Sequence, residues 1–409
     1  MEEIKVKNKL KRVKIPEGWL ETKLGKVCGK IIVGIATEVK PYVRDIGVPI
    51  VRNQNIHEDY FDDSEMIFIC EKFDEKNKNK RIKAGDILVV RTGSNVGKAC
   101  IVPFKYNNAQ TFTTLIIRIG ERVESKFLSL HINSFGIKEV ERLAVGGGKP
   151  NLNAGFLKDY KILLPSLPEQ RAIAKVLGTI DQAIQSTEAL IAQKELRKKW
   201  LMQNLLTGKK RLSGFEGEWR KMELGEFINE SRIPSISNDV NKRITVKLNL
   251  KGIEKRDVRG SESEDATNYF VRKAGQFIYG KQNLHKGAFG IIPVSLDDFE
   301  SSQDLPTFDF TNKIIPDYFL FFLSQENIYM SLEKISTGTG SKRIHPESLC
   351  KVKYQFPSLN EQGSISEILQ TAHQEIKLLK AKAEKLREQK KGMMQVLLTG
   401  KVRVKVEKS

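Results

Sequence analysis

PSLPEQRAIAKVLGTIDQAI (165–184) returns, with changes, as PSLNEQGSISEILQTAHQEI (357–376). The two stretches begin 192 residues apart (357 − 165 = 192), and the same interval separates the endings QNLLTGK (203–209) and QVLLTGK (395–401). Between 165–209 and 357–401, 20 of 45 positions are identical without a gap. A shorter repeat precedes each stretch, GWLETKLGKV at 18–27 and EWRKMELGEF at 218–227. The chain is therefore a tandem duplication in which a globular segment and a long helix occur twice.

Both repeated stretches have the signals of a long helix. Glu169 and Glu361 stand in the first turn, where the helix dipole favours a carboxylate, and Gly208 and Gly400 follow the last apolar residues. Apolar residues recur at alternating steps of four and three, which is the pattern of a coiled coil. The predicted seam is Ile173, Leu177, Ile180 and Ile184 in the first helix, and Ile365, Leu369, Ile376, Leu379 and Leu386 in the second.

Each helix exposes one apolar stripe, so we expect the two helices to pack on each other, antiparallel if a two-fold axis relates the repeats. A helix of about 38 residues is about 57 Å long at about 1.5 Å per residue, and the pair would hold the globular segments at opposite ends. The predicted segments are a first domain (1–164), a first helix (165–209), a second domain (210–356), a second helix (357–401) and a basic tail (402–409).

Composition narrows the class of protein. The 409 residues carry a net charge of +19, which favours a partner bearing phosphate; the alternative is a soluble protein that is merely basic. Four scattered cysteines without a C-x-x-C pair, and five scattered histidines, argue against a metal site or a disulfide framework and predict a reducing cytoplasm. No apolar run is long enough for a membrane span.

Candidate nucleic-acid contacts cluster in GDILVVRTGSNVGKACIV (85–102), which is predicted to form a strand, a glycine-rich turn and a strand. Arginine suits guanine and phosphate, asparagine suits adenine, and small hydroxyls with glycine allow close approach of the backbone. The alternative is a plain hairpin turn without function. The candidates are Arg91, Thr92, Ser94, Asn95 and Lys98, with Gln110 added from residue type alone.

The second repeat places GQFIYGKQNLHKGAFGIIP (275–293) at the comparable point, with different side chains. Its candidates are Lys281, Gln282, Asn283, His285 and Lys286. A glycine-rich loop also precedes the exit from each domain, at 145–153 and 336–344. These loops are predicted to clamp phosphate through Lys149, Asn151, Lys342 and Arg343, or else to be connectors with incidental charge.

The P-S-L-x-E-Q helix start, the LLTGK helix end, the duplication and GDILVVRTGSNVGKACIV resemble the specificity (S) subunit of type I restriction–modification systems. The resemblance covers essentially the whole chain. It implies an α+β architecture of two mixed α/β target-recognition domains joined by two long helices in an antiparallel coiled coil. It also implies that each domain reads half of a bipartite duplex DNA site, and that the helices set the spacer and dock two methyltransferase (M) subunits. Restriction (R) subunits complete such a complex.

Catalytic motifs are missing from the chain. The sequence has no N-P-P-[YF] or D-P-P-[YF] tetrapeptide and no Walker A motif. We therefore expect no cofactor on this chain, and we expect S-adenosylmethionine, ATP and Mg²⁺ on partner subunits. The rival hypotheses are a coiled-coil adaptor that binds protein, a cryptic nuclease, and the specificity subunit of a related restriction system that is not type I.

Overall fold

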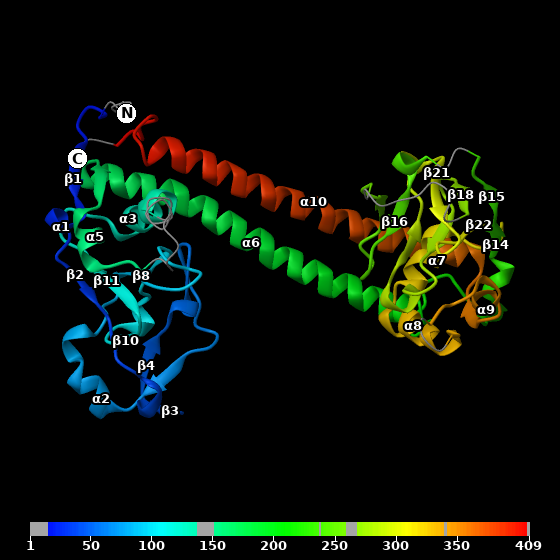
Figure 1. The fold of residues 1–409 in the computed structure, drawn as a ribbon, viewed down its shortest axis with the longest axis horizontal. Coiled ribbons are helices and arrows are strands. Elements are labelled where there is room, and N and C mark those ends of the chain that lie inside the picture. The colour runs from blue at the N-terminus through cyan, green and yellow to red at the C-terminus, as the bar shows by residue number, and fades with distance from the viewer. Residues whose placement is uncertain (1–14, 137–150, 237–238, 259–267, 339–341, 407–409) are drawn as a thin grey trace, which may run out of the picture. The chain divides into compact units, whose positions relative to one another are not determined.

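The computed structural model describes residues 15–136, 151–236, 239–258, 268–338 and 342–406. The chain forms two compact units, residues 1–187 with 382–409 and residues 188–381. The boundary crosses both long helices, α6 (Leu167–Leu205) and α10 (Leu359–Leu397), which fall within the predicted helical segments. Each unit therefore contains one globular domain, half of α6 and half of α10 (Figure 1).

The first unit is built on a four-stranded antiparallel sheet in the order β2-β11-β8-β9. Its strands are Lys30–Val33, Thr114–Arg118, Ile87–Val90 and Ala99–Ile101. A second sheet, β10-β4-β7-β3, comprises Gln110–Thr111, Val48–Val51, Ile67–Ile69 and Val43–Arg44. Two pairs complete the strands, β1 (Leu20–Lys23) with β12 (Lys161–Leu164) and β5 (Ile56–His57) with β6 (Tyr60–Phe61). The α-helices are α1 (Leu24–Val27), α2 (Glu71–Lys76), α3 (Ser125–His131) and α5 (Ala154–Asp159).

The second unit repeats the main sheet as β14-β22-β19-β20, also antiparallel throughout. These strands are Ile228–Ser231, Thr307–Phe310, Phe277–Tyr279 and Phe289–Ile291. A second sheet contains β15 (Ile233–Pro234), β18 (Tyr269–Arg272) and β21 (Phe299–Ser302). The other described strands form two pairs, β13 (Arg220–Glu223) with β23 (Lys353–Phe356) and β16 (Ile244–Val246) with β17 (Ile253–Lys255). Its short helices are α7 (Pro316–Leu323), α8 (Glu326–Ser331) and α9 (Pro346–Cys350).

The core of each unit joins its domain to both long helices. In the first unit Ile173 and Leu177 of α6 are buried in one cluster with Leu397 of α10 and its neighbour Leu398. In the second unit Ile365 and Leu369 of α10 share a cluster with Leu205 and Leu206. The start of one helix thus meets the end of the other in each unit, which confirms the antiparallel pairing.

The predicted seam needs one correction. Its first residues, Ile173, Leu177, Ile365 and Leu369, lie in the domain cores and are not confined to a contact between helices. Ile376 is buried, whereas Ile180, Ile184, Leu379 and Leu386 remain partly exposed. The reason is that the first turns of each long helix pack against the preceding domain as well as against the end of the partner helix.

Ion pairs fix the register of the two helices within each unit. In the first unit, Lys390 Nζ lies 2.7 Å from Asp181 Oδ1. In the second unit, Lys380 Nζ lies 2.7 Å from Glu195 Oε1. Residue numbers rise along α6 as they fall along α10, as an antiparallel pair requires.

A buried ion pair closes the second unit where α6 ends and α10 begins. Arg211 donates from Nε to Glu361 Oε1 at 2.6 Å and from Nη2 to Oε2 at 2.7 Å, while its Nη1 donates to the carbonyl of Gly217 at 2.8 Å. The guanidinium also lies 5.9 Å from the ring centroid of Trp219. The Glu361 carboxylate is only 2% exposed, so this arginine is what compensates its charge.

The first unit contains the same arrangement, 192 residues away (403 − 211 = 192). Arg403 donates from Nε and Nη2 to Glu169 at 2.6 and 2.8 Å, and its guanidinium lies 5.9 Å from the Trp19 ring. Trp19 Nε1 adds a hydrogen bond to Glu169 Oε2 at 3.3 Å. We call each arginine, glutamate and tryptophan set a clasp: Arg403, Glu169 and Trp19 in the first unit, and Arg211, Glu361 and Trp219 in the second.

The glycine of each LLTGK ending makes its clasp possible. Gly208 and Gly400 adopt left-handed φ angles of 71° and 68°. The N–H of Lys210 then reaches the carbonyl of Asn204, and the N–H of Val402 reaches that of Val396, which closes the helix end. A Cβ at Gly400 would lie 2.5 Å from Pro16 Cγ and 3.2 Å from the Trp19 ring, so the close approach to the tryptophan also requires glycine there.

The glutamine that follows each clasp glutamate ties its helix to its domain. Gln170 donates to the carbonyls of Pro165 and Arg122 and accepts from the N–H of Glu124. Gln362 donates to the carbonyl of Pro357 and accepts from the N–H of Ile315. Both glutamines are almost fully buried, so the repeated E-Q pair has a structural role in both units.

Replacing Arg211 by alanine is expected to lower the free energy of unfolding by about 2–4 kcal/mol, because Glu361 would stay buried without a counter-charge. Arg403→Ala should act similarly through Glu169. Urea denaturation followed by circular dichroism measures both losses. The matched control is Arg220→Ala, an exposed arginine on β13, which should change stability by less than about 0.5 kcal/mol. Equal effects in all three variants would contradict the role of the clasps.

Candidate nucleic-acid interface

The glycine-rich turn of the first unit joins β8 to β9, as the sequence predicts. Its backbone closes through hydrogen bonds from the N–H of Val90 to the carbonyl of Lys98 and from the N–H of Gly97 to the carbonyl of Val90, each 2.9 Å. Gly93 and Gly97 adopt φ angles of 96° and 85°, which few other residues tolerate. The turn therefore has a defined backbone, which sets where its polar residues leave the chain.

The exit loop of the first domain returns to this turn. The N–H of Leu152 donates to the carbonyl of Arg91 at 2.9 Å, and Arg91 Nε donates to Asn151 Oδ1 at 3.1 Å. Two candidates from distant parts of the sequence thus meet in space. Arg91 has a neutral side-chain partner in Asn151, and no ion pair joins Arg91 or Lys98 to a carboxylate among the described residues, so both charges are available to a phosphate.

The second unit builds the corresponding turn between β19 and β20. The N–H of Gly280 donates to the carbonyl of Ala288 at 2.9 Å, and Gly287 has a φ of 72°. Gln282 and Lys286 are exposed, whereas Lys281, Asn283 and His285 are partly buried. Burial lowers the pKa of Lys281, with the charge of Asp304 acting in the opposite direction.

The exit loop of the second domain returns to its turn by the same backbone contact. The N–H of Ile344 donates to the carbonyl of Lys281 at 2.8 Å, and Ile344 stands 192 residues after Leu152 (344 − 152 = 192). The frame is therefore common to both units, while the side chains at the contact differ: Arg91 and Asn151 in one, Lys281 and Arg343 in the other.

The two cations of the second exit loop are compensated within the domain. Arg343 Nε lies 3.4 Å from Asp304 Oδ1, and Lys342 Nζ lies 3.5 Å from Glu333 Oε1. All four side chains are more than one third exposed, so solvent weakens both pairs and a phosphate could displace the carboxylates. Lys149, the matching candidate of the first loop, lies outside the described residues.

One candidate is wrong. Gln110 is 0% exposed, and its Nε2 donates to Asp74 Oδ1 at 2.7 Å and to the carbonyl of Asn77 at 3.1 Å. Burial raises the pKa of Asp74, but hydrogen bonds from Arg81 and Gln110 outweigh it and hold that pKa below its ordinary value. Gln110 therefore supports the domain from inside and has no access to a base.

Two residues that the sequence did not single out position the turns. Asn53 Nδ2 donates to the carbonyl of Thr92 at 3.0 Å. In the second unit the carbonyl of Asp304 accepts from the N–H of Lys281 at 2.9 Å, and its carboxylate faces Arg343. Both residues belong to polar stretches without periodicity, so only the tertiary fold reveals their contacts.

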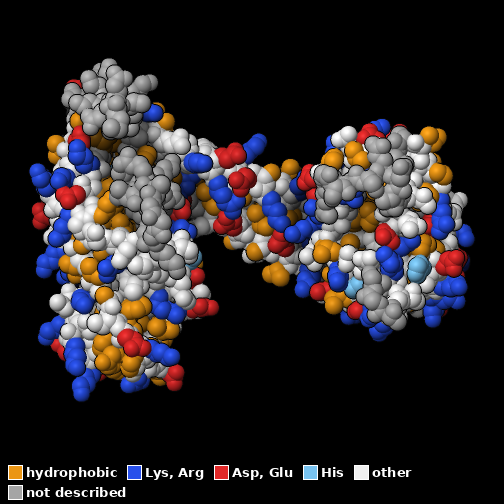
Figure 2. Space-filling model, viewed as in Figure 1, with side chains coloured by type: hydrophobic (Ala, Val, Ile, Leu, Met, Phe, Trp, Pro, Cys, Tyr) orange, Lys and Arg blue, Asp and Glu red, His pale blue; other side chains and the backbone are white. Residues whose placement is uncertain are grey.

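Surface charge does not by itself locate the interface. In Figure 2, lysine and arginine side chains are scattered over the visible face of both units and do not gather in one stripe. Within the described residues, no three His, Cys, Asp or Glu side chains come together in a way that could hold a metal ion. None of the described helices has the length and apolar character that a bilayer crossing requires.

Comparisons with known proteins agree with the duplicated architecture. The family model described as "Type I restriction modification DNA specificity domain" matches twice, at residues 16–195 and 216–388. The putative type I restriction enzyme MjaX specificity subunit of Methanocaldococcus jannaschii is 25% identical, over 96% of this chain and 95% of that protein. The type I restriction enzyme EcoKI specificity subunit of Escherichia coli is 21% identical, over 86% and 81%.

Solved structures share the fold. The S subunit of a type I restriction–modification system from M. genitalium superposes with a TM-score of 0.59 at 14% identity, covering 93% of this chain and 96% of that one. The HsdS subunit from Thermoanaerobacter tengcongensis gives a TM-score of 0.52 at 18% identity, covering 96% and 99%.

Gln110 and Arg91 should respond to substitution in opposite ways. Gln110→Ala is expected to lower the free energy of unfolding by about 1–3 kcal/mol, because a buried carboxylate loses a hydrogen bond, and to leave DNA recognition intact. Arg91→Ala should leave stability nearly unchanged and weaken DNA binding. Chemical denaturation and DNA titration of each variant measure both quantities. A loss of DNA affinity in folded Gln110→Ala would contradict its assignment to the core.

Proposed function

The chain belongs to the type I restriction–modification DNA specificity family, and we propose that each of its domains reads one half of a bipartite site in double-stranded DNA. The chain acts as the DNA specificity subunit of such a system. We place the chemistry on partner chains: methyltransferase subunits that carry S-adenosylmethionine, and restriction subunits that use ATP and Mg²⁺.

One observation carries the proposal. In both units the exit loop donates the same backbone hydrogen bond to a residue near the start of the turn, Leu152 to Arg91 after β8 and Ile344 to Lys281 after β19. Around this shared contact the turns carry unlike side chains, with Thr92, Ser94 and Asn95 in one and Gln282, Asn283 and His285 in the other. A common frame with different hydrogen-bonding groups is what two different half-sites require, since sequence is read by side chains at base edges.

The long helices supply the second part of the proposal, a fixed spacer between the half-sites. Each is a single α-helix of 39 residues, and its antiparallel register is set within each unit by ion pairs and clasps. A rod with a defined register is suited to fixing a separation between two readers.

The helices also present a surface suited to two copies of one partner. Several residues are identical in the two repeats and exposed in both, so packing does not explain why they are retained. Each unit presents one full set, drawn from both helices: Thr179, Gln182, Lys391, Gln395 and Lys401 in the first, and Thr371, Gln374, Lys199, Gln203 and Lys209 in the second. We assign these two surfaces to two methyltransferase subunits.

Methylation mapping tests the assignment. The chain is co-purified with the methyltransferase from the neighbouring reading frame, and methylated bases are mapped on genomic DNA. We expect a split motif with two unlike halves and a constant gap. Replacing residues 1–164 by the domain of another such subunit should change one half only. A change in both halves would contradict modular reading, and failure to bind a methyltransferase would favour a protein-binding adaptor.

The number of bound methyltransferase subunits tests the repeated surfaces. Gln182→Arg and Gln374→Arg each place a bulky charge on one surface, so each is expected to reduce the complex from two methyltransferase copies to one. The double variant should bind none. Mass photometry of the purified complexes gives the count. Glu384→Arg, an exposed position of α10 outside both sets, is the control and should retain two copies.

A further inference from the structure

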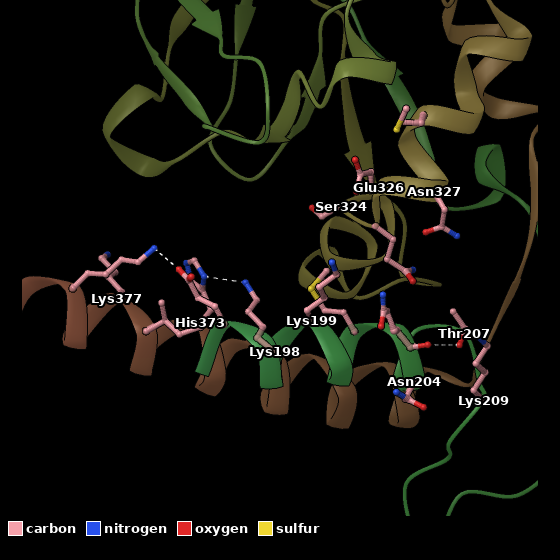
Figure 3. A pocket seen from close by; sticks show the side chains of 17 residues that line it. Lys198, Lys199, Asn204, Thr207, Lys209, Ser324, Glu326, Asn327, His373 and Lys377 are labelled. Carbon is pink, nitrogen blue, oxygen red and sulfur yellow. Dashed lines mark hydrogen bonds and ion pairs between the residues drawn. The ribbon is translucent and has the colours of Figure 1, made fainter. Parts of the chain in front are cut away.

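A cationic cavity lies within the second unit, between the end of α6, the middle of α10, and α8 with the short segment before it. Its volume is about 1,120 Å³, and Figure 3 shows its labelled side chains coming from these three parts. Five lysines line it against two glutamates, Glu195 and Glu326. The lysines are Lys198, Lys199, Lys209, Lys377 and Lys380.

Most of this positive charge lacks an internal counter-charge. Lys380 pairs with Glu195, but the other four lysines have no carboxylate within 4 Å among the described residues. Lys198 is partly buried, and its Nζ lies 3.2 Å from His373 Nδ1 and 5.5 Å from the centre of the Phe321 ring. Burial lowers the pKa of Lys198, with Lys380 acting in the same direction, and burial together with three lysines lowers the pKa of His373.

In the first unit, the lysine that corresponds to Lys198 is neutralised by carboxylates of the chain itself. Lys390, which corresponds to Lys198 (390 − 198 = 192), lies 2.7 Å from Asp181 and 3.7 Å from Asp59. The two repeats differ at three positions on one face of the helix, spaced four and three residues apart. Asp181 and Gln185 of the first unit, with Glu188 just beyond its boundary, correspond by the repeat to His373, Lys377 and Lys380. The second unit thus keeps the lysine, loses the carboxylates and gains two cations, which leaves an external anion to balance the charge.

The lining favours phosphate over other anions. Lysine is a point-charge binder of phosphate, whereas a planar carboxylate is better matched by arginine, and no arginine lines the cavity among the described residues. The amides of Gln203 and Asn327 add neutral donors. No phenylalanine, tyrosine or tryptophan belongs to the described lining, so the cavity lacks the large rings on which bases usually stack.

We propose that this cavity binds phosphate groups without regard to sequence, as a site separate from the two recognition turns. It shares Lys199, Gln203 and Lys209 with the surface assigned to a methyltransferase subunit, whereas Lys198 and Lys377 belong to the cavity alone. The phosphate comes either from a DNA backbone or from a soluble polyphosphate, and the experiment below distinguishes these sources. This inference goes beyond the proposed reading of half-sites. It is also independent of that proposal, because the triphosphate titration is done without DNA.

The test compares two double variants of the full chain that remove the same charge. Lys198→Gln with Lys377→Gln alters the cavity, and Lys382→Gln with Lys385→Gln alters exposed positions of α10 outside it. Inorganic triphosphate is titrated calorimetrically at low salt, and binding of duplex DNA without a defined site is measured over a range of salt concentrations. Circular dichroism verifies that both variants are folded.

We expect the cavity variant to bind triphosphate about tenfold more weakly than the control variant. If the DNA backbone uses the site, its salt slope should also fall by about 1.8, or about 0.9 per lost contact. A loss of triphosphate binding alone identifies a soluble ligand, and a loss of DNA binding alone identifies the backbone. Either result supports the proposal. If the two variants have the same triphosphate affinity and the same DNA salt slope, the proposal is overturned, and binding depends only on overall surface charge.

An independent readout comes from His373. Bound phosphate should raise the pKa of His373, because an anion favours the protonated imidazole, and NMR titration of its ring resonance with and without triphosphate measures the change. A His373 titration that changes neither with triphosphate nor with duplex DNA would overturn the site. Loss of the methyltransferase subunit from the cavity variant, with triphosphate binding intact, would instead make the cavity a protein contact. Arg91→Ala should leave triphosphate binding unchanged, which separates failure of this site from failure of half-site reading.

Discussion

A buried carboxylate at the first turn of each long helix is the constraint on which the rest of the structure depends. Glu169 and Glu361 are almost inaccessible to water, so each must be compensated by a cation held in one geometry. The cation comes from the residues that follow the other long helix, Arg403 and Arg211. One ion pair thus joins the start of one helix to the end of the other, and the antiparallel arrangement follows from it.

Much of the architecture could be predicted because the sequence contains a tandem duplication. The 192-residue interval and the apolar period predicted two long antiparallel helices, and the glycines of LLTGK marked where they end. The purpose of the repeated residues was not predictable. Trp19, Glu169 and Arg403 are 150 and 234 residues apart along the chain, and only tertiary packing brings them together. The seam could not be predicted in full, because Ile173 and Ile365 satisfy the coiled-coil period and also pack into domain cores.

The candidate site was less predictable than the fold, for a physical reason. Residue type suggests what a side chain can bind but not whether it reaches the surface. Gln110 was a candidate from residue type alone and Arg91 from its place in the glycine-rich turn; Gln110 lies inside the domain on Asp74, whereas Arg91 lies at the turn beside Asn151. The backbone contact that both exit loops make could not be predicted either, because it joins main-chain atoms and does not depend on particular residue types.

The discontinuous first unit has a consequence for biosynthesis. Residues 188–381 form one continuous unit, so they can complete their core and clasp while the end of the chain is still being translated. The first unit needs residues 382–409 as well, because Leu397 and Leu398 belong to its core and Arg403 compensates Glu169. The domain that emerges first from the ribosome is therefore the last to be finished, and until then it exposes an apolar helix face and an unpaired carboxylate to chaperones and proteases.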